Sequence, residues 1–168
     1  KSFKDLSLRI VNATMNVFLA IATNAQFMPT ARKFHYQFNL RDFSKIIQNL
    51  TLAQPALYKG NPLGVVRMWA HECHRVWRDR LITDQDVDSY MGFMTNGCKE
   101  FPDMKPDEIF AEPLLYTSYV AACEGHEANY KPVDTMEKLK EILEQKLEEY
   151  NENVGSMKTY HDMQKALM

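Results

Sequence analysis

The chain has 168 residues, 20 Lys and Arg against 22 Asp and Glu, a formal net charge of −2, and 45% hydrophobic residues. This length suits one domain or two small ones, and the ordinary composition excludes collagen-like, low-complexity and disordered proteins. The charge balance argues against nucleic acid as a partner. We expect no membrane partner either, because the longest apolar stretch, residues 11–25, is interrupted by polar side chains.

Hydrophobic residues recur at helical spacing along most of the chain, and strand signals are few. The pattern predicts an all-α fold, an irregular helical bundle with at most a short extended segment near residues 34–38, where aromatic residues alternate. The predicted helices cover about residues 4–25, 40–50, 63–77, 84–97, 107–111, 135–154 and 157–168. Residues 102–133 contain four prolines and are the least regular part.

Three predicted helices begin with capping signals. Asn39 with Asp42, Thr83 with Asp86, and Asp134 with Glu137 each place an N-cap acceptor three residues before an acidic side chain. The last of these helices is strongly amphipathic, and we expect Gly155 to end it. The chain begins with Lys1, and its last helix reaches Met168 without a stop signal. We therefore expect a fragment of a longer protein.

Residues 71–75, His-Glu-Cys-His-Arg, resemble the zinc-peptidase pattern H-E-x-x-H. The position of the second ligand is taken by Arg75, a cation that cannot bind zinc, so we predict no metal site there. We expect Glu72, Arg75 and Asp79 to form ion pairs on a helix surface instead. The sequence contains no phosphate-binding glycine loop and no serine nucleophile motif. We therefore predict no catalytic residue, no cofactor in the fragment and no enzyme activity of its own.

Arg41 is the one residue whose position suggests a ligand. It lies in the first turn of the helix that follows Asn39, where a cation opposes the helix dipole. Such an arginine could meet an anion such as a phosphate. The alternative is a salt bridge to Asp42, Asp5 or another carboxylate.

Two segments resemble the dynein heavy chains, closest to the axonemal (ciliary and flagellar) type. Residues 27–43 read FMPTARKFHYQFNLRDF and residues 66–81 read VRMWAHECHRVWRDRL. Both are similar to motifs of that family, in the same order and at a similar separation. The departures include Asn49, where glycine is common, which leaves the turn after that helix in doubt.

The resemblance implies that the fragment belongs to a ring of AAA+ modules, as the lid of the third module and the start of the fourth. Residues 1–101 would form the helical lid, and residues 102–168 would connect it to the next module. Arg41 would match the lid arginine known as sensor 2, which meets the γ-phosphate of the nucleotide. The intact parent would bind ATP or ADP with Mg²⁺, contact neighbouring modules, microtubules and other dynein subunits, and work in the cytoskeleton of the axoneme.

Without the resemblance, the sequence also allows a second function, the binding of other proteins. The ten Met and nine Phe residues could serve an autonomous helical module that binds other proteins, such as an adaptor or scaffold. A nucleotide-binding loop upstream of this segment and another soon after it would favour the motor.

Overall fold

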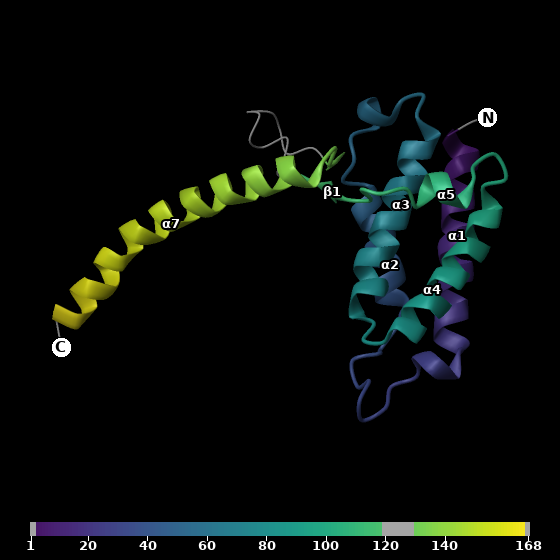
Figure 1. The fold of residues 1–168 in the computed structure, drawn as a ribbon, viewed down its shortest axis with the longest axis horizontal. Coiled ribbons are helices and arrows are strands. Elements are labelled where there is room, and N and C mark those ends of the chain that lie inside the picture. The colour runs from purple at the N-terminus through teal and green to yellow at the C-terminus, as the bar shows by residue number, and fades with distance from the viewer. Residues whose placement is uncertain (1–2, 119–129, 167–168) are drawn as a thin grey trace. The chain divides into compact units, whose positions relative to one another are not determined.

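The computed structural model describes residues 3–118 and 130–166 and confirms the all-α class (Figure 1). The chain divides into two compact units, Lys1–Tyr116 and Thr117–Met168. The α-helices are α1 (Phe3–Thr23), α2 (Leu40–Leu50), α3 (Pro62–Val76), α4 (Asp84–Gly97), α5 (Pro106–Ile109) and α7 (Met136–Ala166). Short 3₁₀ helices are η1 (Ala25–Phe27), η2 (Pro55–Tyr58), η3 (Arg78–Arg80) and η4 (Cys98–Glu100), and two-residue strands are β1 (Tyr116–Thr117) and β2 (Lys131–Pro132).

Helix α3 is the centre of the first unit. It contacts α1, α2, α5, η2 and η3, and it is enclosed on most of its circumference rather than on one face. Ala70 and Cys73 of this helix are fully buried, but so is Glu72, which we expected at the surface. Trp69 also lies in the core, where its indole N–H donates to the Thr14 hydroxyl of α1 at 2.9 Å. This hydrogen bond satisfies two buried polar groups and joins α1 to α3.

Helix α1 packs against α2, α3 and α4, and the buried residues Ile10, Val17 and Ile21 lie at helical spacing along it. By length and composition alone, residues 4–23 are apolar enough to cross a membrane, with a mean hydropathy of 1.4. We expected no such helix because polar side chains interrupt the apolar run, but they do not lower its mean hydropathy enough to exclude one. The buried face accounts for this composition in the same way as for the core helix of a globular domain.

The segment before α2 differs from the alternating strand that its aromatic residues suggested. Residues 34–35 lie in a turn closed by the hydrogen bond from the Tyr36 N–H to the Lys33 carbonyl, directly after a turn closed by that from the Lys33 N–H to the Thr30 carbonyl. Of the alternating aromatic side chains, Tyr36 is buried, whereas Phe34 is 71% exposed. The alternation of aromatic residues along this segment therefore does not reflect the two faces of a β-strand.

The second unit corrects two predictions about the last helix. Thr135, not Asp134, precedes the first turn of α7, and its hydroxyl accepts from the Lys138 N–H at 3.3 Å. The helix also continues through Gly155 instead of ending there, so residues 135–154 and 157–166 form one helix (Figure 1). A single glycine costs a helix only about 1 kcal/mol relative to alanine, which a long helix tolerates.

Gly97 lies where α4 packs against α1. A Cβ atom at this position would lie 2.8 Å from Cγ2 of Val17, whereas a Cβ at Gly92 of the same helix would meet nothing within 4 Å. Alanine at Gly92 would therefore change helix propensity alone, whereas alanine at Gly97 would also change the packing against α1.

We predict opposite effects of alanine at these two positions. Gly92→Ala should raise the free energy of unfolding by up to about 1 kcal/mol, because alanine is the better helix former. Gly97→Ala should lower it by about 1 kcal/mol, because overpacking against Val17 outweighs the same gain. Urea unfolding of the two variants checks this, and equal stabilisation by both would contradict the packing.

Candidate functional site

The predicted capping box at the start of α2 is present and determines where Arg41 lies. The Asn39 side chain accepts from the Arg41 backbone N–H at 2.8 Å, and the Asp42 carboxylate accepts from the Asn39 N–H at 3.2 Å. Arg41 is therefore the second residue of the helix, and its side chain is exposed. This places a guanidinium beside the positive end of the helix dipole, where an anion is also favoured.

The carboxylates that the sequence offered as partners of Arg41 are bound elsewhere. Asp42 pairs with Nη2 of Arg80 at 2.8 Å, and Asp5 pairs with Arg9 at 3.0 Å. Within the described residues, the Arg41 side chain has no hydrogen bond or ion pair. Its five N–H donors are consequently available to a planar or phosphate-like anion from outside this chain.

Arg80 connects the first turn of α2 to the end of α3. Its Nε donates to the Val76 carbonyl at 2.8 Å while Nη2 donates to Asp42, and its guanidinium lies 4.7 Å from the centre of the Phe38 ring. The Arg80 carbonyl lies 2.9 Å from Nε2 of His35. These contacts could not be read from the sequence, where Arg80 is only one residue of the dynein-like segment 66–81.

Asp86 is the second polar centre that sequence reasoning missed. Expected only as part of a helix cap, it is 1% exposed and lies at the junction of α4 with the loop that leads to α2. It accepts from Nζ of Lys33 at 2.7 Å, from Nε2 of Gln26 at 2.8 Å and from the Tyr36 hydroxyl at 2.9 Å. Burial opposes its ionisation, but these hydrogen bonds and that from Thr83 lower its pKa from 3.8 to about 2.

We predict that Asp86→Asn lowers the free energy of unfolding by roughly 2–3 kcal/mol at pH 7, because Lys33 loses its buried counter-charge. A depressed pKa contributes stability above about pH 4, where the unfolded state also ionises, and this contribution fades as the pH falls toward 2. The difference from wild type should therefore shrink between pH 4 and pH 3 in urea unfolding. The pH dependence of this loss is the specific test of the Asp86 charge.

Asp88→Asn, on the exposed side of the same helix, is the matched control. A difference in free energy of unfolding between Asp86→Asn and wild type that stays constant with pH would contradict the ionised state of Asp86.

The His71–Arg75 segment does not form the surface expected from the sequence. Glu72 is fully buried, and its Oε2 accepts from Asn49 at 2.7 Å and from Nη2 of Arg75 at 2.9 Å. Nδ1 of His71 lies 3.2 Å from the Leu114 carbonyl. No group of three or more His, Cys, Asp or Glu in the part of the chain that the structure describes could hold a metal ion. The residue Asn49 had left the turn after the helix in doubt. In the structure Asn49 lies within α2, and its side chain donates to Glu72.

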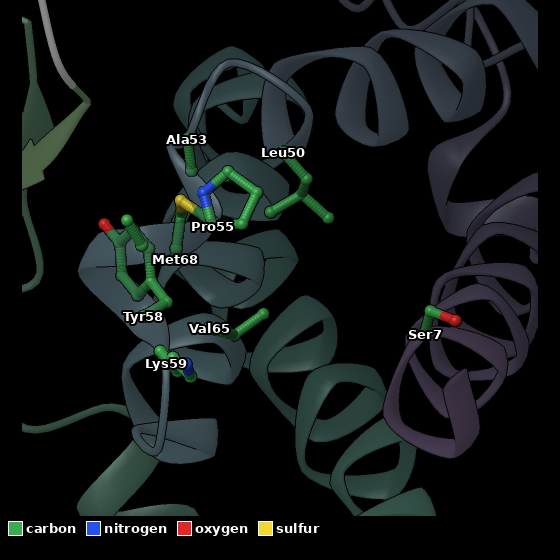
Figure 2. Close-up of a pocket in the computed structure, with 9 residues that line it drawn as sticks. Ser7, Leu50, Ala53, Pro55, Tyr58, Lys59, Val65 and Met68 are labelled. Carbon is green, nitrogen blue, oxygen red and sulfur yellow. The ribbon is translucent and has the colours of Figure 1, made fainter. Parts of the chain in front are cut away.

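A separate cavity of about 730 Å³ opens beside η2 (Figure 2). Its walls are mostly apolar side chains from the end of α2, from η2 and from α3, including Leu50, Pro55, Tyr58 and Met68, with Lys59 at one side. Such a lining suits an apolar side chain of another protein segment and offers too few donors for a polyphosphate.

Comparison with known proteins identifies the family. The model of the AAA+ lid domain matches residues 10–111, which include Arg41, Arg80 and Asp86. The chain belongs to the AAA+ lid domain family.

The relatives of this chain are dynein heavy chains of cilia and flagella. It is 39% identical over 156 residues to the dynein beta chain of the flagellar outer arm of Chlamydomonas reinhardtii. It is 34% identical over 152 residues both to the ciliary dynein beta chain of Tripneustes gratilla and to human dynein axonemal heavy chain 17. Each match covers 90% of this chain but 3% of the relative. The resemblance seen in the sequence is thereby confirmed over nearly the whole chain.

Proposed function

We propose that this chain is the lid of the third AAA+ module of an axonemal dynein heavy chain and that Arg41 senses the nucleotide of that module. Residues 1–101 form the lid in this proposal, and residues 102–168 lead into the fourth module. The observation that carries it is the exposed Arg41 guanidinium in the first turn of α2, which has no partner within the described residues while Asp42 and Asp5 are occupied. The lid match and the axonemal relatives support the context.

The mechanism is a relay rather than chemistry by this chain. The core of the module would hold ATP or ADP with Mg²⁺, and this chain contributes Arg41, whose donors fit the oxygens of a γ-phosphate. Contact with the γ-phosphate draws α2 toward the core, and loss of that phosphate releases it. Because α2 is bonded to α3, the lid moves as one body and passes the change to the next module.

The parent protein would then be an ATP-driven microtubule motor of the ciliary or flagellar axoneme, and the other heavy-chain modules would be the direct partners of this chain. This part of the proposal rests on relatives named as flagellar outer arm, ciliary and axonemal dyneins.

The alternative is an autonomous module that binds other proteins, and the apolar cavity beside η2 favours it. In that case Leu50→Glu, which places a charge at a half-buried position of the cavity wall, would abolish binding of a partner protein without any link to nucleotide. The flanking sequence separates the two functions, since only the motor requires phosphate-binding loops on both sides.

We predict that Arg41→Ala in the complete module weakens ATP binding about tenfold, because one charge-assisted contact to phosphate is lost. Binding of ADP should change less than twofold, since the γ-phosphate is absent. Titration with fluorescent ATP and ADP analogues measures both affinities. Lys45→Ala, on the exposed surface of the same helix, is the matched control. Unchanged ATP affinity in the Arg41 variant would remove the sensor assignment.

The isolated 168-residue chain should neither hydrolyse ATP nor bind it tightly, because a single arginine cannot replace a phosphate-binding loop. Calorimetric titration should give a dissociation constant for ATP of about 1 mM or higher, which corresponds to weak binding. Micromolar affinity would show that this chain has a nucleotide site of its own.

A further inference from the structure

We propose that Arg80 is a positioning residue for Arg41: it holds the first turn of α2 against the end of α3 and neutralises the carboxylate that lies beside the phosphate site. The inference rests on the proposed contact between Arg41 and the γ-phosphate.

The first part of the argument is geometric. Helix α2 follows a loop without strand pairing, so its first turn needs contacts outside the loop to be held in one orientation. Arg80 supplies them on three sides: Nε reaches the Val76 carbonyl of α3, Nη2 reaches Asp42 of α2, and the flat guanidinium covers the Phe38 ring just before α2. Asp42 immediately follows Arg41, so this contact sets the direction of the Arg41 backbone.

The second part is electrostatic. Asp42 is needed to cap α2, because its carboxylate accepts from the Asn39 N–H. The same negative charge, next to Arg41 in the chain, would otherwise compete with a phosphate for the Arg41 guanidinium. The Arg80 guanidinium at 2.8 Å offsets this charge and leaves the Arg41 charge for the ligand. The Arg80 side chain is 30% exposed and that of Asp42 17%, so solvent only partly screens the pair.

A lysine could perform one of these tasks but not both. Its single ammonium could neutralise Asp42, but it lacks the planar fork that reaches Val76 and Asp42 at once while lying flat over Phe38. Arg80→Lys therefore separates charge from geometry. Arg78, on the same short helix, is exposed, and its side chain makes no hydrogen bond or ion pair with any residue that the structure describes, so Arg78→Ala is the matched control.

The test measures affinity for fluorescent ATP and ADP analogues in the complete module. Arg80→Ala should weaken ATP binding about fivefold, with ADP binding changed less than twofold, and Arg80→Lys should lie between it and wild type. The decisive variant combines Arg80→Ala with Arg41→Ala. If Arg80 acts through Arg41, the double variant binds ATP no more weakly than Arg41→Ala alone.

Each outcome separates the two claims. If Arg41→Ala leaves the ratio of ATP to ADP affinity unchanged, the proposed sensor fails and the positioning role fails with it. If Arg41→Ala lowers the ratio but Arg80→Ala does not, or if the two effects multiply in the double variant, only the role of Arg80 is overturned. Thermal unfolding identifies a loss of fold in Arg80→Ala, and Arg80→Lys then decides: a ratio equal to wild type contradicts the geometric role, and a lowered ratio supports it.

Discussion

The buried carboxylate of Asp86 is the constraint on which the path of the chain into α2 depends. A charge with 1% exposure must be compensated, and its partners Gln26, Lys33 and Tyr36 all come from the loop between α1 and α2. That loop has little regular structure of its own, so the need to satisfy Asp86 selects its conformation. Because Asp86 holds Tyr36 by its hydroxyl, the few residues between Tyr36 and Asn39 have little conformational freedom.

Helix α2 is then held at both of its ends by charged groups of α3 and the turn after it. At its start Asp42 binds Arg80, and near its end Asn49 binds the buried Glu72. Truncating either partner of the buried contact would leave an uncompensated polar group, which makes this attachment costly to break. Arg41, immediately before the first of these anchored points, is exposed without a partner among the described residues. A rigid helix with one unpaired cation in its first turn is suited to transmit the presence of an anion.

The sequence predicted most of the helices and two of the three N-caps, because hydrophobic periodicity and the N-cap residues Asn39 and Thr83 are local signals. It singled out Arg41 but left a salt bridge open as the alternative, and the role of Arg41 stays a prediction. It could not predict that Glu72 and Asp86 are buried, because a charged residue enters a core only when partners distant in sequence surround it. Asp86 and Lys33 are 53 residues apart, and Arg80 and Asp42 are 38 apart. Around residue 34 the alternating aromatic pattern misled for a different, local reason, because turn hydrogen bonds set the backbone there.

The most direct measurement is an experimental structure of the complete module with a non-hydrolysable ATP analogue and Mg²⁺. The account predicts that the Arg41 guanidinium lies about 2.7–2.9 Å from a γ-phosphate oxygen, the length of a charge-assisted hydrogen bond, while Arg80 still binds Asp42. An Arg41 side chain that points away from the nucleotide, or that pairs with a carboxylate of the core instead, would contradict it.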